Sequence, residues 1–216
     1  MSTEKTLKQE NFWYIQAYTL LLIVVFWWFT QGFSIQEAFS SLDTVNAWIE
    51  KLLSATFLSA VAYIVTIVLN GLLSSKIKYI LVFWRVKNTL PGHRAFSKLM
   101  AKEPRINADI LINKYGELPQ APAEQNSFWY QIYKKYEKDK TVLEAQKNFL
   151  LMREMTAITC ILIVSFAIIS PWTITNWLYF FYYLVGLLIC TILTSIAGRN
   201  YGKRLVMNVL AIDSIQ

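Results

Sequence analysis

Histidine and cysteine are scarce in this sequence, and this scarcity limits the metal chemistry it can support. The 216 residues include one histidine, His93, and two cysteines, Cys160 and Cys190. Zinc is held by clusters of cysteine and histidine side chains, which this composition does not offer. Both cysteines lie in apolar runs, where we expect them to pack as small side chains without forming a disulfide. The sequence therefore predicts no metal site.

Motifs that bind nucleotides or activate a nucleophile are also absent from the sequence. It contains no GxxxxGK[ST] phosphate loop, no GxGxxG turn and no GxSxG nucleophile motif. The acidic residues Glu103, Asp109, Glu117 and Glu124 have no spacing that indicates a catalytic pair. We expect no catalytic residue and no cofactor, and hence a protein that is not an enzyme.

Three long runs lack any Asp, Glu, Lys or Arg, namely residues 11–36, 52–75 and 155–198. A hydrocarbon core about 30 Å thick needs about 20 helical residues for each crossing. The first two runs are each long enough for one span, and the third is long enough for a hairpin of two. The sequence predicts an all-α polytopic membrane protein with four transmembrane helices and a helical cytosolic insertion between the second and the third.

The cations set the expected orientation. Every Lys and Arg except Lys51 falls on one side of a four-span arrangement, and cytoplasmic segments are enriched in these residues. We expect a bacterial inner membrane protein with both termini in the cytosol and a short outer loop at residues 37–51. Tryptophans favour the membrane boundary, and five fall at the outer one: Trp27, Trp28, Trp48, Trp172 and Trp177. The expected parts are residues 1–75 with the first two spans, 76–154 as the insertion, 155–198 as the hairpin and 199–216 as a cytosolic tail.

The insertion should be helical throughout. The second membrane helix should continue past Lys76 until Pro91 and Gly92, and a capping-box spacing from Thr141 to Glu144 should open a helix that enters the membrane unbroken. Between them we expect helices at residues 94–102, 108–115 and 124–138, the second closed by Gly116. The apolar residues of the tail could pack on the insertion or lie along the lipid surface.

Two stripes at helical spacing mark the apolar runs. The second run has a polar seam, in which spacings of three and four place polar side chains on one face: Thr56, Ser59, Tyr63, Thr66 and Asn70. Such a seam can pack against other helices through hydrogen bonds or line a pore in an oligomer. The last run has small residues at intervals of four, which indicate close helix packing: Gly186, Cys190, Thr194 and Gly198.

The basic insertion has three possible roles. Its cations can contact an anionic inner leaflet, with His93 and Arg94 near the membrane. Aromatic and basic side chains can instead form a docking face for a cytosolic protein, built on Trp129, Tyr133, Tyr136, Lys134 and Lys135. Nucleic-acid binding is the third role and the least supported, because no recognised motif organises the basic and aromatic residues.

Three segments carry a resemblance: Leu90-Pro91-Gly92-His93-Arg94-Ala95-Phe96-Ser97, Gln125-Asn126-Ser127-Phe128-Trp129-Tyr130 and Phe149-Leu150-Leu151-Met152-Arg153. These segments resemble motifs in uncharacterised bacterial membrane proteins of this size. Four spans, a helical cytosolic insertion and no enzyme motif resemble small multi-pass membrane subunits of bacterial anti-phage systems, such as the membrane protein of Kiwa-type systems or the membrane effectors of some retrons. The resemblance implies a membrane-embedded oligomer that partners a soluble effector, or that itself injures the membrane once triggered. It assigns no role to a numbered residue.

These observations together predict a homo-oligomeric inner-membrane anchor and signal-transducing subunit for a cytosolic effector, and the resemblance implies a place in anti-phage defence. A pore-forming effector that depolarises the membrane is the closest rival hypothesis. An enzyme that modifies lipid headgroups is the second alternative.

Overall fold

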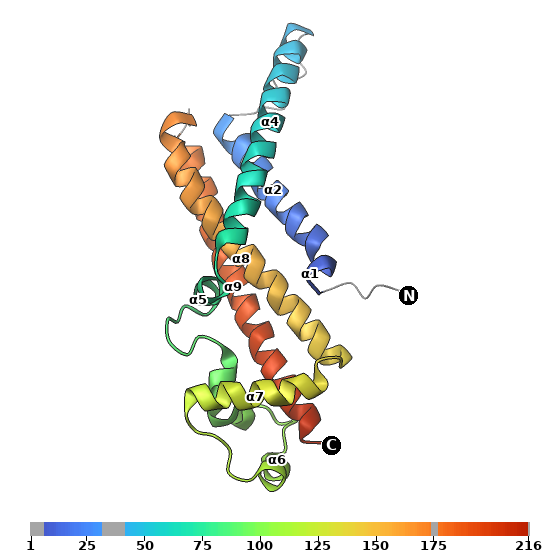
Figure 1. Cartoon of the computed structure of the whole chain (residues 1–216). Coiled ribbons are helices and arrows are strands. Elements are labelled where there is room, and N and C mark those ends of the chain that lie inside the picture. Colours follow the sequence, from blue (N-terminus) through green and yellow to red (C-terminus); the bar gives the residue numbers. More distant parts are fainter. Residues whose placement is uncertain (1–6, 32–41, 174–176, 216) are drawn as a thin grey trace, which may run out of the picture. The chain divides into compact units, whose positions relative to one another are not determined.

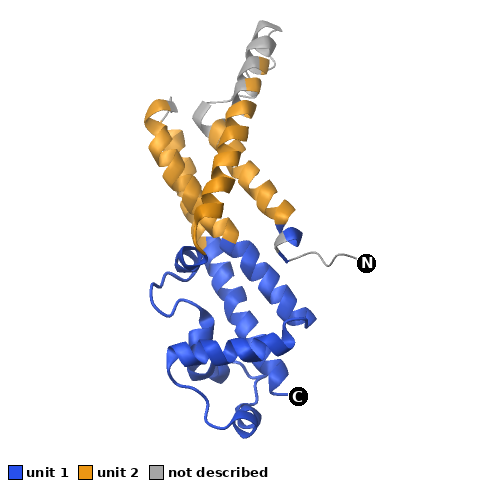
Figure 2. Ribbon diagram, in the orientation of Figure 1, with its two compact units in different colours: residues 1–11, 75–153, 193–216 blue, residues 12–74, 154–192 orange. Residues whose placement is uncertain are grey.

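A computed structural model describes residues 7–31, 42–173 and 177–215 of the chain (Figure 1). Across these ranges the secondary structure is helical, and they contain no strand. The prediction of an all-α protein is confirmed. The described chain forms two compact units, which Figure 2 shows in blue and orange. Unit 1 comprises residues 1–11, 75–153 and 193–216, and unit 2 comprises residues 12–74 and 154–192.

Unit 2 is an apolar helical bundle. It contains α2 (Phe12–Gln31), α4 (Leu42–Leu72), the second part of α8 (Lys140–Thr173) and the first part of α9 (Trp177–Asp213). In its core the ring of Phe26 stacks on that of Phe166 with centroids 3.8 Å apart, and the Tyr183 hydroxyl donates to the Leu22 carbonyl at 2.8 Å. The core therefore joins α2 to both α8 and α9.

Two of the described helices, α8 and α9, are long and apolar enough to cross a membrane. A third span is present if α4 and the following α5 (Ser75–Phe83) together form one broken crossing. The apolar stretch of α2 with described side chains, Phe12–Trp27, is shorter. A membrane location is thus plausible, whereas the predicted four transmembrane helices are not confirmed.

The outer boundary expected from tryptophan positions is only partly matched by burial. Trp172 and Trp177 are exposed, but Trp27 is buried in the core of unit 2. The side chains of Trp28 and Trp48 lie outside the described part. Helix α4 already begins at Leu42, inside the range 37–51 that the sequence predicts as a loop.

The second membrane helix does not continue unbroken to Pro91, and this prediction is wrong. Helix α4 ends at Leu72 and α5 begins at Ser75, so the break falls at Leu73 and Ser74. Serine hydroxyls compete with the helix for backbone hydrogen bonds, and two serines follow each other here. Helix α5 ends at Phe83, and the next residue, Trp84, adopts a left-handed backbone with φ of 52°.

Unit 1 has its own core, built on the end of α9. The insertion supplies a 3₁₀ turn at Pro91–Arg94, a π turn at Ala95–Leu99, a further 3₁₀ turn at Met100–Lys102, α6 (Ala108–Tyr115) and α7 (Pro122–Tyr136). These elements pack on buried residues of α9: Leu205, Val206, Val209, Leu210 and Ala211. The tail therefore packs on the insertion, and it does so as the continuation of α9 to Asp213.

The helix ends explain why the insertion folds as short pieces. Asn107 caps α6 by accepting from the amides of Asp109 and Ile110, and Gly116 with φ of 77° ends the helix as predicted. The predicted capping box at Thr141 is wrong, because Asp139 is the cap of α8. Its Oδ1 accepts from the Thr141 amide at 2.8 Å and from the Thr141 hydroxyl at 2.6 Å. These hydrogen bonds, the one from the hydroxyl first, lower the pKa of Asp139 below its usual range.

Candidate functional site

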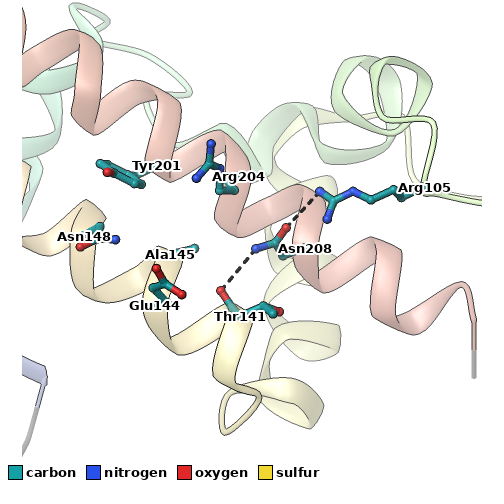
Figure 3. Close-up of a pocket in the computed structure, with 8 residues that line it drawn as sticks. All are labelled: Arg105, Thr141, Glu144, Ala145, Asn148, Tyr201, Arg204 and Asn208. Atoms are coloured by element: carbon teal, nitrogen blue, oxygen red, sulfur yellow. Dashed lines mark hydrogen bonds between the residues drawn. The ribbon is translucent and has the colours of Figure 1, made fainter.

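A polar groove lies between α8 and α9 in unit 1 (Figure 3). Its volume is about 400 Å³, within the range of small-ligand pockets. Figure 3 shows the lining side chains of the two helices facing one another, with Arg105 from the loop before α6 at one end. The lining residues are Arg105, Thr141, Glu144, Ala145, Asn148, Tyr201, Arg204 and Asn208. We call this site the α8–α9 groove.

Helical periodicity places these side chains together. On α8 the lining positions 141, 144, 145 and 148 recur at intervals that share one face, and on α9 the positions 201, 204 and 208 do the same. The polar stripe of α8 thus faces the polar stripe of α9 across the groove. Each stripe is readable in the sequence, but their pairing depends on the fold, and sequence reasoning missed this site.

Hydrogen bonds fix one end of the groove. Arg105 donates from Nη2 to Asn208 Oδ1 at 3.1 Å, and Asn208 Nδ2 donates to the Thr141 carbonyl at 3.3 Å. Arg105 Nε also donates to Glu103 Oε1 at 2.7 Å. This hydrogen bond raises the pKa of Arg105 and lowers that of Glu103, so both side chains stay charged near neutral pH. The loop before α6 is thereby tied to both long helices.

The middle of the groove offers charged and polar groups that can bind a ligand. The Arg204 guanidinium lies 5.8 Å from the centroid of the Tyr201 ring, and no carboxylate pairs with it in the described chain. Glu144 and Asn148 add an acceptor and an amide. The eight lining residues include no Ser, Cys or His, and no group of His, Cys, Asp and Glu in the described ranges could hold a metal ion. This chemistry fits recognition of a polar, partly anionic group.

A buried aspartate near the end of α9 ties three helices of unit 1 together. Asp213 Oδ1 accepts from Lys114 Nζ at 3.0 Å, from the Tyr115 hydroxyl at 3.0 Å and from the Tyr136 hydroxyl at 2.8 Å. The carboxylate is fully buried. Burial first, and then the bond to Asp213, raises the pKa of Tyr136 to about 12. The hub cannot be read from the sequence, because its members are close in space only after folding.

The aromatic docking face predicted for the insertion is mostly core. Trp129 and Tyr133 are buried, and the Tyr133 hydroxyl donates to Gln146 Oε1 at 2.8 Å. Tyr136 is half-buried on the Asp213 hub. The prediction that these rings form an exposed partner surface is therefore corrected: α7 turns them inward to complete the small core of unit 1.

The basic residues predicted beside those rings stay at the surface. Lys134 is exposed and pairs with Glu137 at 2.7 Å, and Lys135 is exposed with Nζ 3.1 Å from the Tyr115 hydroxyl. His93 lies in the 3₁₀ turn Pro91–Arg94, with Nδ1 2.9 Å from the carbonyl oxygen of Pro122 at the start of α7. Arg94 is half-buried, and burial first, then the charge of Arg85, lowers its pKa. Of the predicted contact residues, these four remain near solvent.

The polar seam of α4 meets other helices of unit 2 along part of its length. Ser59 and Thr66 are buried, whereas Thr56 is exposed. The Tyr63 hydroxyl donates to Gln16 Oε1 on α2, and Asn70 Nδ2 donates to Glu154 Oε2 on α8 at 2.9 Å. The seam therefore makes interhelical hydrogen bonds within a single chain.

The small-residue stripe of α9 divides into two halves. A Cβ added at Gly198 would lie 2.9 Å from Val82 Cγ1, so this glycine permits close contact with α5. A Cβ added at Gly186 would meet no atom within 4 Å. Cys190 and Thr194 are half-buried between them. Gly202, which the stripe did not include, packs closely against Phe83 and Phe149.

Comparisons of the chain with protein families, with curated proteins and with solved structures find no match. Structure and sequence alone therefore carry the functional argument.

Proposed function

We propose that this chain is the membrane anchor and signal-transducing subunit of a bacterial anti-phage system, and that it partners a soluble effector in the cytosol. The observation that carries the proposal is the continuity of α8 and α9. Each helix runs without a break from the apolar unit 2 into unit 1, where the same two helices form the walls of the groove.

Helix continuity supplies a route for a signal. At 1.5 Å per residue the 34 residues of α8 and the 37 residues of α9 extend about 51 and 55 Å, well beyond a hydrocarbon core of about 30 Å. A partner segment inserted in the groove changes the separation of the two helices there. Both helices continue into the helical bundle of unit 2. In this proposal, a change in the separation of α8 and α9 at the groove alters the packing of that bundle, as a shift between discrete arrangements.

The chemistry of the groove favours an acidic partner segment. Residues 76–154 hold the whole formal net charge of +7. At the groove Arg105 is paired with Glu103, whereas Arg204 forms no ion pair with a described carboxylate and is open to one from a partner. Complementary charge speeds association and selects among partners. A carboxylate-bearing loop of a soluble protein is the occupant that we propose.

The test is co-purification of the tagged chain with the products of its neighbouring genes, after extraction in mild detergent. We expect one stoichiometric soluble protein to be retained, and Arg204→Glu to reduce its retention at least tenfold. Lys98→Glu is the matched control, since Lys98 is exposed, lies outside the groove and changes the charge equally. Equal retention by the two variants, or no retained protein with the wild type, would contradict the proposal.

One observation favours the second candidate, a pore-forming effector. Glu154 is a buried carboxylate in the apolar unit, and it accepts from Asn70 at the end of the polar seam. Ionisable groups inside membrane bundles often mark ion pathways. A voltage-sensitive dye separates the candidates. Expression of the chain alone should leave the membrane potential unchanged if it is an anchor, and should collapse it if the chain forms a pore.

A further inference from the structure

A cluster of arginines in unit 1 has no carboxylate partner among the described residues. Arg85 and Arg94 come from the segment after α5, and Arg199 comes from α9. Arg85 directly follows Trp84, whose ring centroid lies 3.8 Å from the Arg199 guanidinium carbon, so the backbone holds Arg85 near Arg199. The charge of Arg85, after burial, also lowers the pKa of Arg94. None of the three forms an ion pair with a described Asp or Glu. Like charges gathered in this way indicate a site that binds an anion.

Arg199 makes one structural hydrogen bond and has one buried donor atom without a described partner. Its Nε donates to the Val82 carbonyl at 2.7 Å, and Ser195 Oγ donates to the Leu81 carbonyl at 3.3 Å, so α9 caps the end of α5. Figure 1 shows α5 beside α9 at this level. The Nη2 atom of Arg199, in contrast, is buried and has no hydrogen-bond partner in the described chain. A buried donor of a charged group without a partner is costly, which indicates that an acceptor is bound there in use.

Trp84 holds the guanidinium in place at the expense of backbone strain. The Arg199 guanidinium carbon lies 3.8 Å from the centroid of the Trp84 ring, a close stacking contact. To make it, Trp84 adopts φ of 52°, a conformation that is costly for a bulky residue. Strain of this kind persists where the surrounding structure imposes it, and it clusters at binding sites.

The surroundings of the cluster match the headgroup layer of a membrane. Trp84 and Val86 are 57% and 71% exposed, and they alternate with the exposed cations Arg85 and Lys87. Exposed indole and aliphatic side chains interleaved with cations are typical of segments that enter a lipid interface. Arg199 is also the first cation after the uncharged run 155–198. Both features favour a lipid phosphate over a phosphate dissolved in the cytosol.

We propose that Arg199, Arg85 and Arg94, with Trp84 as a platform, bind the phosphodiester of one anionic phospholipid. The phosphate oxygens accept from the guanidinium groups of the three arginines. The acyl chains extend beside Trp84 and Val86. This site goes beyond the proposed partner function and does not depend on it, because no residue of the cluster lines the α8–α9 groove.

The test uses native mass spectrometry of the purified full chain in detergent, titrated with phosphatidylglycerol, phosphatidylcholine or glycerol phosphate. We expect one phosphatidylglycerol to be retained in preference to phosphatidylcholine, and glycerol phosphate to bind far more weakly. Arg199→Gln should weaken retention of phosphatidylglycerol about tenfold, as expected for loss of hydrogen bonds to a charged group. Arg85→Gln should weaken it about fivefold, by removal of one cation near the lipid surface.

Lys203→Gln is the matched control, because it removes one exposed cation from the same helix outside the cluster and should change retention less than twofold. Arg199→Gln also loses a cap on α5, so Arg85→Gln, an exposed position in the loop, tests the site without that structural change. Equal losses in all three variants would reveal non-specific attraction and overturn the proposal. So would unchanged retention in both arginine variants, equal binding of phosphatidylcholine, or equally tight binding of glycerol phosphate.

Discussion

Two glycines of α9 should respond in opposite directions to the same substitution. Gly186→Ala adds a methyl group where no atom lies within 4 Å, so the variant keeps only the gain in helix propensity, about 0.5–1 kcal/mol. Gly198→Ala gains the same propensity but places Cβ 2.9 Å from Val82 Cγ1 and 3.4 Å from Met152 Cβ. The two positions therefore form a matched pair on one helix.

The cost at Gly198 follows from how little its neighbour can move. Val82 is fully buried, and its carbonyl is held by Arg199. Forcing a methyl group into such packing costs about 1–3 kcal/mol. The difference in unfolding free energy between the two variants should then be about 1–3 kcal/mol. For a chain of this size, each kcal/mol shifts the Tm by about 2–4 °C.

Thermal unfolding in detergent, followed by tryptophan fluorescence, measures the difference. We expect Gly186→Ala at or above the wild-type Tm, and Gly198→Ala about 2–12 °C below Gly186→Ala. Indistinguishable Tm values would show that α5 does not pack on α9 as described. A lower Tm for Gly186→Ala than for Gly198→Ala would refute the reasoning outright.

Three further predictions concern unit 1. Asp213→Ala leaves the hydroxyls of Tyr115 and Tyr136 without their carboxylate acceptor and should cost about 3 kcal/mol of unfolding free energy. Asp213→Asn keeps an acceptor oxygen and should cost less, and equal losses in a denaturant titration would refute the hub. Because the pKa of Tyr136 is raised from about 10 in the unfolded chain to about 12 in the folded one, this hydroxyl stabilises the fold fully below about pH 10, and the stabilisation is lost as the pH rises toward 12. Tyr136→Phe should therefore flatten the fall of Tm between about pH 10 and 12. An unchanged slope would contradict this. Asp139→Ala should cost about 1–2 kcal/mol by removing the cap of α8, while exposed Lys138→Ala should stay within about 0.5 kcal/mol in the same titration.

Local chemistry made several helices predictable from the sequence. Helix α6 was placed correctly because Gly116 is a strong end signal. The long run of α8 into the apolar region was predictable because no glycine or proline interrupts it before Pro171. The start of that helix was misread because aspartate is a stronger cap than threonine, and Asp139 stands two residues before Thr141.

The groove, the hub and the arginine cluster were not predictable, because each depends on which helix faces which. Spacing alone shows that Trp129 and Tyr133 share a face of α7, but not whether that face meets solvent or the end of α9. The break between α4 and α5 contains no proline, so the sequence gives no strong signal for it. The small-residue stripe of α9 contains Gly186, which has open space around it, and Gly198, which packs closely against Val82. The spacing of the glycines is the same in both cases, so it does not show which of them contacts a neighbouring helix.

The Asp213 hub also constrains the timing of synthesis. Lys114 and Asp213 are 99 residues apart, and at about 5–20 residues per second the ribosome needs roughly 5–20 s to make the intervening chain. During that interval α6 and α7 have been synthesised, but the end of α9, which completes the core of unit 1, has not. Chaperone access or translation pausing over this window should therefore govern how much of the newly made protein matures.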